Sequence, residues 1–323
     1  MNTFKKIGLS ALAGSLAAMS VNAADLSVTG KAGITFAGQD KTAKGNGWSM
    51  TDNMTFAGSA ELDNGWTVAT SFLLDNSDGA TGAIFDTRTL TIDMNDMGKL
   101  TFHGADGSSA MHAVDDVMPY AGGNEGWDLI AAADSGTALF KRVSGTGGTN
   151  SFKYNNSTLG VDGLSVTTSY QPSNATQIEG TVSYAVAYTG VEGLTVGYGA
   201  DENGLLGTAA IDAETMYIKY AYGPITVGMQ ESETDANTSA NSDEFSAMSI
   251  SYTVSDDLSV SYSESAYNAG DKASDEEHTM IGASYTMGSM SLAVSMNTID
   301  NAGGSTAAID DIQGYELALS FVF

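Results

Sequence analysis

The sequence predicts an all-β protein, a transmembrane antiparallel up-and-down β-barrel of about 16 strands. Three observations lead to this fold class. Large apolar residues recur at every second position in many short segments, and the connections between these segments alternate between short and long. The chain also ends on Phe323, at the hydrophobic end of such a segment. Period-two alternation is the pattern of a strand with one apolar and one polar face.

Single segments show the alternation clearly. LSVSYS (258–263) places Leu258, Val260 and Tyr262 on one face and three serines on the other, and TVSYAVAY (181–188) sets valine and tyrosine against threonine, serine and alanine. Such runs predict strands over 26–37, 48–62, 66–75, 83–94, 99–105, 150–157, 164–171, 178–189, 193–200, 212–222, 224–232, 243–254, 258–267, 278–287, 289–299 and 312–323.

The connections between these strands fall into two length classes. Short ones such as 63–65 and 190–192 alternate with long ones such as 38–47 and 201–211. A membrane barrel has short periplasmic turns at one rim and long extracellular loops at the other, whereas the loops of a soluble sandwich need not sort in this way. A strand of about 10 residues at ~3.3 Å each, tilted by roughly 45°, covers ~25 Å, the height of the apolar band of an outer membrane.

In the terminal segment GYELALSFVF (314–323), every second residue counted back from Phe323 to Tyr315 is large and apolar. Chain ends of soluble domains usually fray into water, so a free end of this kind is unexpected there. In a closed barrel the last strand pairs with the first, and LSVTGKAGITF (26–36) has the matching pattern. We therefore expect the last strand to close the barrel, with Phe323 at the periplasmic rim.

The N-terminus predicts a cleaved signal peptide over 1–23. Lys5 and Lys6 precede an apolar stretch that is too short to span a membrane, and small residues end at Ala23. The barrel would then occupy 24–323. Losing both lysines takes the formal charge from −27 to −29. This charge argues against a nucleic-acid partner, whose phosphates would be repelled. It is compatible with cations as partners, or with an acidic surface that is simply solvated. The chain has no cysteine, which excludes disulfides and thiolate metal sites.

In these features the chain resembles the Gram-negative general porins, in particular those of alphaproteobacteria. The resemblance rests on a signal peptide followed by Ala24-Asp25, the Leu-Ser-Val-x-Gly pattern from Leu26, the strand number, a very long third loop and the terminal aromatic residue. It implies a homotrimer of water-filled barrels in outer-membrane lipid, inserted by the barrel-assembly machinery. That machinery would read the alternating residues of the last strand, Tyr315, Leu317, Leu319, Phe321 and Phe323.

Strand parity predicts which charged residues face the lumen. If Leu26 and Val28 face lipid, the opposite face of the strands carries charged residues of both signs. Such a face is suited to a water-filled lumen, whereas burying these charges in a sandwich core would be energetically costly. Arg88 shares parity with lipid-facing residues, so we expect either a β-bulge or a subunit contact with Asp86 there. The predicted lumen-wall residues are Lys31, Glu61, Asp93, Lys153, Glu179, Lys219 and Glu316.

The 44-residue connection 106–149 is the strongest candidate functional site, because long connections inside compact domains are commonly functional. In porins the third loop narrows the lumen, so the resemblance makes DDVMPYAGGNEGWD (115–128) a pore constriction; the alternative is a loop folded on the surface. Family members oppose such acids with an arginine cluster, but this chain has two arginines in all, which weakens the expected field. The predicted constriction acids are Asp106, Asp115, Asp116, Glu125, Asp128 and Asp134.

Neither a cofactor nor an enzymatic activity is expected. No G-x-S-x-G elbow accompanies the three histidines, which lack ligand spacing. The acid-rich segments 231–235 and 271–277 are assigned to outer loops that could hold Ca²⁺ or Mg²⁺ loosely, or could simply be solvated.

The sequence therefore predicts passive diffusion of small hydrophilic solutes and ions with a weak preference for cations. A substrate-specific channel remains an alternative that shares the barrel. A closed-barrel adhesin or structural anchor is the alternative from another class.

Overall fold

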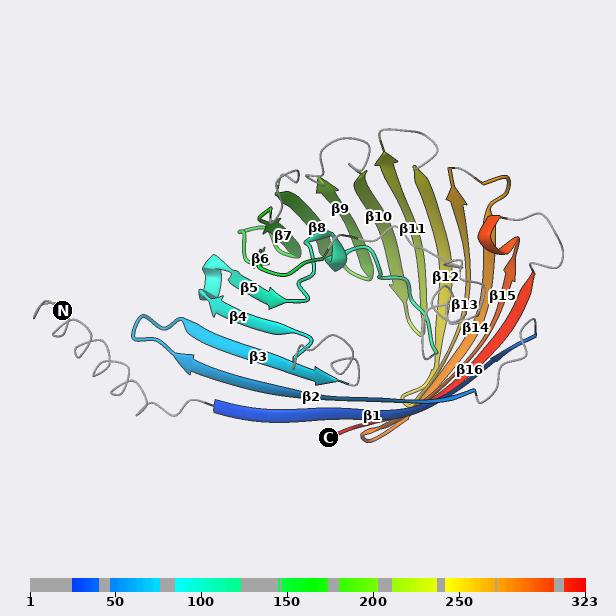
Figure 1. Cartoon of the computed structure of the whole chain (residues 1–323), viewed down its shortest axis with the longest axis horizontal. Helices are drawn as coiled ribbons and strands as arrows, with labels where there is room; N and C mark the ends of the chain where they lie inside the picture. The colour runs from blue at the N-terminus through cyan, green and yellow to red at the C-terminus, as the bar shows by residue number, and fades with distance from the viewer. Residues whose placement is uncertain are drawn as a thin grey trace, which may run out of the picture.

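The computed structural model describes residues 25–40, 47–75, 85–122, 145, 147–173, 180–202, 211–236, 242–270, 272–304 and 311–323. These residues form one closed antiparallel barrel in which each strand pairs with its neighbours in sequence (Figure 1). The strands are β1 Asp25–Gln39, β2 Trp48–Glu61, β3 Thr67–Asp75, β4 Arg88–Asp93, β5 Lys99–Ala105, β6 Ser151–Asn156, β7 Leu164–Gln171, β8 Thr181–Val191, β9 Leu194–Glu202, β10 Ile211–Tyr222, β11 Ile225–Ala236, β12 Asp243–Ser255, β13 Leu258–Ala269, β14 Glu276–Met287, β15 Met290–Asp300 and β16 Ile312–Val322.

The last strand closes the barrel against the first, as the terminal alternation predicts. The register between β16 and β1 runs from Lys31 opposite Val322 to Gln39 opposite Gly314. Phe323 extends the pairing, because it exchanges two backbone hydrogen bonds with Gly30, at 2.7 and 2.9 Å. Closure leaves no unpaired strand edge, which is required where no water reaches the backbone.

The burial pattern is inverted relative to a soluble domain. Large apolar side chains lie exposed on the outer face, among them Leu26 at 79% and Met296 at 66% exposure. Small polar side chains on the inner face are buried, such as Ser183 and Ser295 at 1%. An apolar belt around a polar interior is what a lipid environment requires of a barrel.

The two rims differ as predicted. The short rim is made of 62–66, 94–98, 157–163, 192–193, 223–224, 256–257 and 288–289, and the long rim of the remaining connections. Gly223 and Gly288 adopt φ of 57° and 62°, a left-handed conformation that suits glycine in two-residue hairpin turns. Among the described residues no helix is long and apolar enough to cross a membrane.

Two strands differ from the prediction in a way that bears on the outer surface. β11 continues to Ala236, so the acid-rich segment 231–235 is strand rather than loop. β4 begins only at Arg88, where the register with β5 shifts and Gly104 is the extra residue of a bulge. The Arg88 side chain remains on the outer face and donates a hydrogen bond to Gly104 O at 3.1 Å.

Candidate functional site

The lumen contains the first part of the connection between β5 and β6. Residues 106–122 leave β5, form the short 3-10 helix η3 (Met111–Ala113) and cross the inner side of the later strands, as the teal trace in Figure 1 shows. Met111 and Val114 are almost completely buried. They belong to an apolar cluster between this loop and the wall, made of Ala110, Met111, Val114, Met118, Ala185, Ala213, Tyr217, Phe245 and Ala247. The described part of the loop is therefore packed inside the barrel and not folded over its surface.

Polar side chains of the wall bind the loop backbone. Ser169 Oγ and Ser183 Oγ accept hydrogen bonds from Ala110 N and Met111 N, at 2.8 and 2.9 Å. Further along, Gln230 Nε2 donates to Asp115 O at 2.7 Å. The wall thus supplies partners for loop groups that would otherwise be buried without one.

The predicted constriction acids have different surroundings. Asp115 is 1% exposed, and its Oδ2 accepts a hydrogen bond from Gly145 N at 2.8 Å, so this carboxylate joins two parts of the loop. Asp116 is half-buried, and Asp106 is exposed with a left-handed φ of 44°. Glu125, Asp128 and Asp134 lie outside the described residues. The constriction role stays a prediction, and what the structure shows for Asp115 is its bond to Gly145 N within the loop.

The predicted lumen-wall residues that the structure describes all share the inner face, by the strand registers. Lys31 and Glu61 are exposed, while Glu316 is buried. Asp93 forms an ion pair with Lys99 at 2.8 Å. Glu179 lies outside the described residues.

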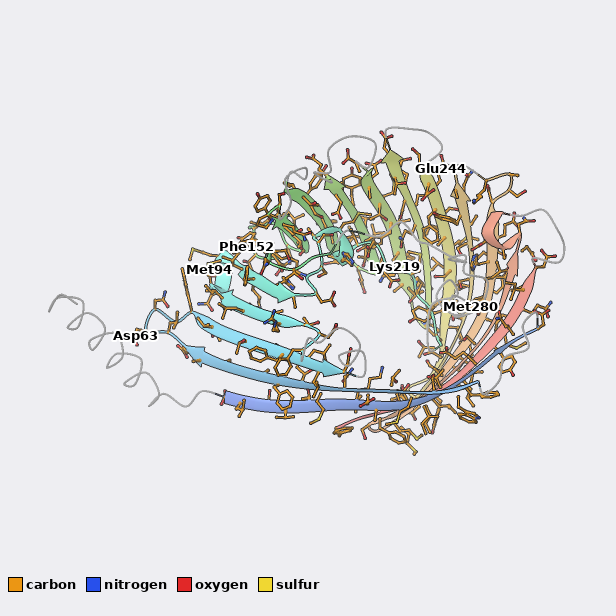
Figure 2. The ribbon with its side chains drawn as sticks, viewed as in Figure 1. Asp63, Met94, Phe152, Lys219, Glu244 and Met280 are labelled. Atoms are coloured by element: carbon orange, nitrogen blue, oxygen red, sulfur yellow. The ribbon has the colours of Figure 1, made fainter. Side chains whose placement is uncertain are left out.

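Two further predicted wall residues, both lysines, contact the loop directly. Lys153 Nζ donates a hydrogen bond to Ser108 Oγ at 2.7 Å, and Lys219 Nζ donates to Val117 O at 3.2 Å. Figure 2 shows side chains on both faces of the wall, with Lys219 labelled beside the interior. These two lysines therefore help to position the loop, and they also place positive charge on the inner face.

The residues predicted as an assembly signal lie on the outer face of the closing strand. The ring of Phe323 covers Gly30 so closely that a Cβ there would be 2.8 Å from its Cζ. Tyr315 packs against Phe36, with ring centroids 5.8 Å apart. Leu317, Leu319 and Phe321 share this face, by their parity with Tyr315. Their recognition by an assembly machinery stays a prediction.

The sequence did not point to a buried histidine–glutamate pair on β14. His278 Nε2 lies 2.8 Å from Glu276 Oε1, and Glu276 Oε2 accepts a hydrogen bond from Gly303 N. Glu276 was assigned to an acidic outer loop, but it belongs to the inner face of β14 and is 3% exposed. The i, i+2 spacing on a strand is the signal that could have placed both side chains on one face.

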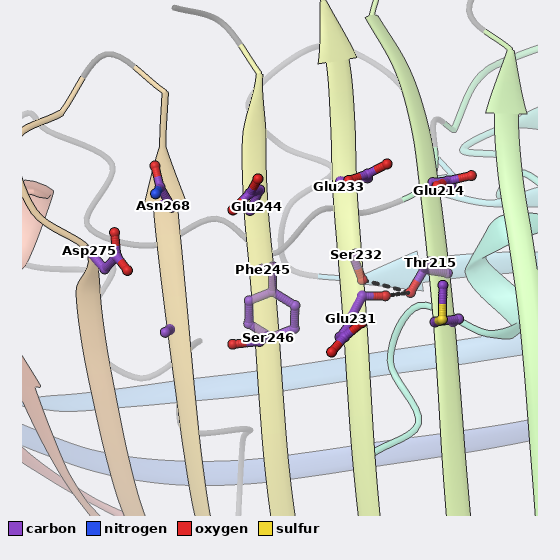
Figure 3. Close-up of a pocket in the computed structure, with 12 residues that line it drawn as sticks. Glu214, Thr215, Glu231, Ser232, Glu233, Glu244, Phe245, Ser246, Asn268 and Asp275 are labelled. Carbon is purple, nitrogen blue, oxygen red and sulfur yellow. Dashed lines mark hydrogen bonds between the residues drawn. The ribbon is translucent and has the colours of Figure 1, made fainter. Parts of the chain in front are cut away.

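A second unforeseen feature is an acidic cleft of about 360 Å³ on the outer face (Figure 3). Glu214 lies opposite Glu233, and Glu233 opposite Glu244, on the neighbouring strands β10, β11 and β12. Figure 3 shows these three carboxylates side by side near the long-loop rim. Among the described residues no group of three or more His, Asp or Glu side chains is arranged to hold a metal ion.

A closed barrel with an apolar outer belt, a polar lumen and a loop packed inside that lumen is a membrane channel by architecture. A family model described as Gram-negative porin matches residues 8–304, and the chain belongs to this family. The protein is therefore a passive channel of the bacterial outer membrane and not an enzyme.

Solved structures with the same fold support this assignment at the level of architecture. An anion-selective porin from Comamonas acidovorans superposes with a TM-score of 0.68 at 14% identity, over 93% of this chain and 100% of that chain. OmpF of Salmonella typhi, in complex with daunomycin, gives 0.67 at 16% identity, over 92% and 97%. A loop-deletion variant of OmpT from Vibrio cholerae gives 0.64 at 16%, over 93% and 100%. No curated protein matches the chain significantly.

Proposed function

We propose that this porin is a water-filled channel for small hydrophilic solutes and ions with a weak preference for cations. The supporting observation is the charge of the inner face. The described strands direct eight acidic side chains but only four lysines to the lumen. The acids are Asp25, Glu61, Asp75, Asp93, Asp201, Asp243, Glu276 and Glu316, and the bases are Lys31, Lys99, Lys153 and Lys219.

The acids outnumber the lysines, so the net charge of the described inner face is negative. The ion pair between Lys99 and Asp93 leaves this net charge unchanged, and Lys153 and Lys219 keep their charge while they donate to neutral oxygens of the loop. Low-dielectric walls focus the remaining field and raise the local concentration of cations. The Debye length is about 8 Å at 0.15 M salt and about 3 Å at 1 M, so the preference should fade in concentrated salt.

Reversal potential across a planar bilayer under a KCl gradient tests the cation preference. We expect a value of cation sign, well below the roughly 59 mV of an ideally selective channel at a tenfold gradient. Replacing the inner acids Glu61, Asp106 and Asp116 by Gln or Asn should move the reversal potential toward zero without abolishing conductance. Anion preference of the wild-type protein at low salt would refute the proposal.

The outer face offers a matched control with the same change of net charge. Glu231, Glu233 and Glu244 lie on the other side of the wall from the lumen. Their replacement by Gln should leave the reversal potential unchanged. An equal shift in both variants would mean that net charge alone, and not the lumen, sets selectivity.

Liposome swelling with sugars of graded size distinguishes the general channel from its alternatives. A size cutoff supports a general porin, and saturation by one solute supports a substrate-specific channel. No swelling would support a closed-barrel anchor.

A homotrimer is supported by a charge on the outer face of β2. Asp52 lies between Met50 and Met54 on that face, where contact with lipid would be unfavourable for a carboxylate. A neighbouring subunit covering this wall would remove that contact. Light scattering of the detergent-purified protein should give three chains per particle, and a monomer would contradict the proposal.

Two weaker associations complete the proposal. Outer-membrane lipid surrounds the apolar belt, and the barrel-assembly machinery recognises the last strand. Ca²⁺ or Mg²⁺ associates loosely with the acidic long-loop rim, where carboxylate oxygens are suitable ligands. Calorimetric titration with either ion should show binding in the millimolar range or weaker.

A further inference from the structure

The outer wall over β8 to β11 contains an apolar groove of about 530 Å³. Two rows of cross-strand neighbours border it. The row nearer the short rim ends with Ile218 opposite Met229, and the other passes from Tyr198 through Met216 to Glu231. The volume lies within the range of small-molecule sites, about 300–1,000 Å³. This tail groove has an apolar lining made of Val186, Tyr188, Val196, Met216, Ile218 and Met229.

A second hollow of about 320 Å³ adjoins the tail groove on the side of the long-loop rim. Tyr198 lines both hollows, so the two are adjacent. The ring of Tyr184 lies beside that of Tyr198, with centroids 6.3 Å apart. The Tyr198 hydroxyl donates a hydrogen bond to Glu214 Oε2 at 2.7 Å. Glu233 lies opposite Glu214 on the next strand (Figure 3). This second hollow is the head pocket.

The head pocket has an acidic lining. Glu202, Asp212 and Asp235 line it together with Glu214 and Glu233. In the strands β8 to β12, the only lysine or arginine is Lys219, which belongs to the inner face. Like charges directly opposite each other on paired strands are destabilising, so a cation between the two glutamates would stabilise this part of the wall.

The position of the two hollows along β10 indicates what surrounds them. Glu214 is eight positions from Tyr222, the aromatic residue at the short-rim turn. At ~3.3 Å per residue and a tilt of roughly 45°, these positions cover ~19 Å, less than the ~25 Å height of the apolar band. The tail groove is therefore beside hydrocarbon, and the head pocket is near the outer edge of the band. A suitable occupant is apolar at one end and cationic at the other.

We propose that the tail groove and the head pocket together bind one outer-membrane lipid whose head group carries an ammonium group. Its acyl chain occupies the groove, and its ammonium group contacts Tyr184, Tyr198 and the carboxylates of Glu214 and Glu233. An ammonium group suits this pocket because it is attracted both to carboxylates and to the faces of aromatic rings. A phosphate head group is repelled by the same acids. The site is on the outer face, so it does not depend on the conduction and selectivity proposed above.

The test is native mass spectrometry of the delipidated protein with two added lipids. One is a dioleoyl lipid with a trimethylammonium-propane head, and the other is dioleoyl phosphatidylglycerol. We expect the cationic lipid to be retained at one molecule per chain, several-fold more strongly than the anionic lipid. Equal retention of the two lipids would overturn the proposal. Retention of phosphatidylglycerol that EDTA abolishes would also overturn it, because a divalent ion would then occupy the head pocket.

Glu214→Gln with Glu233→Gln tests the head pocket and should lower retention of the cationic lipid several-fold. Glu277→Gln with Asp300→Asn is the matched control. These two acids also lie opposite each other on the outer face, on β14 and β15, but they line neither hollow. The control should retain the lipid as the wild-type protein does. The same retention in both variants, reduced or not, would contradict a specific site at the head pocket.

Val196→Trp tests the tail groove by filling it and should also lower retention several-fold. Val260→Trp is the control, because Val260 is exposed on the outer face of β13 and does not line the groove. Heat-modifiable mobility on SDS gels confirms that each variant forms a barrel. Unchanged retention in Val196→Trp would mean that the acyl chain binds elsewhere, and the proposal would fall.

Discussion

Strands β7 to β14 have described residues of the loop against their inner face, whereas several inner-face residues of β1 and β2 are exposed. In the first region, the loop-covered wall, serines and alanines are buried and bind or pack against residues 110–121. In the second, the bare wall, Lys31, Thr51 and Glu61 are exposed. Both regions alternate in the same way in sequence, so the same pattern serves two purposes. Polar groups position the loop on one wall and are exposed on the other.

The largest effect on stability is expected where β16 pairs with β1 and closes the barrel. Deleting Phe323 removes two backbone hydrogen bonds to Gly30 and uncovers that glycine. Buried polar groups left unpaired cost about 1–3 kcal/mol each, so urea unfolding in detergent should show a clear loss of stability. Removing the exposed aromatic ring at the turn, by Tyr222→Ala, is the control and should cost much less.

The assembly role of the same residue has a separate readout. We expect the Phe323 deletion to reduce the yield of barrel in outer membranes more strongly than the yield on refolding in detergent. Equal losses in both settings would indicate that Phe323 acts through stability alone.

A smaller effect should separate the two neighbouring acids of the loop. Asp115→Asn weakens the buried bond to Gly145 N, so it should increase current noise. Asp116→Asn removes a half-buried charge and should mainly shift the reversal potential toward zero. If Asp115→Asn shifted the reversal potential and Asp116→Asn increased the current noise, the difference in burial would not explain the roles of the two residues.

The smallest effect is expected from the lysines of the two walls. Lys31→Gln removes an exposed cation from the bare wall and should raise the cation preference. Lys219→Gln removes the same charge but also the bond to Val117 O, so it should add noise. Identical recordings from the two variants would contradict the division of the wall.

The barrel could be predicted from sequence because its signal is repeated in every strand. Alternation in 258–263 and 314–323 places the correct faces inward and outward, and β1 and β16 pair as expected. The segment 231–235 was misassigned because acids on the outer face near the rim resemble a solvated loop in composition.

The path of the loop could not be predicted, because its contacts leave no periodic trace. Ser249 and Ser261 bind the loop while Ser265 and Ser295 do not, although all four occupy equivalent inner positions. The neighbouring residues at 115 and 116 are likewise both aspartates, but Asp115 is buried and Asp116 is only half-buried. Such differences arise from long-range packing between the loop and strands more than 50 residues away.

Cysteine accessibility tests the division of the wall most directly, because the chain contains no cysteine of its own. Single cysteines would be placed on the bare wall at Thr29 and Thr51, which are exposed, and on the loop-covered wall at Ala185 and Ala247, which are buried against the loop. During bilayer recording, a charged thiol reagent should change the conductance of the first two variants and leave the other two unaffected. Equally fast modification at all four positions would show that the loop does not cover the wall, and would contradict the account.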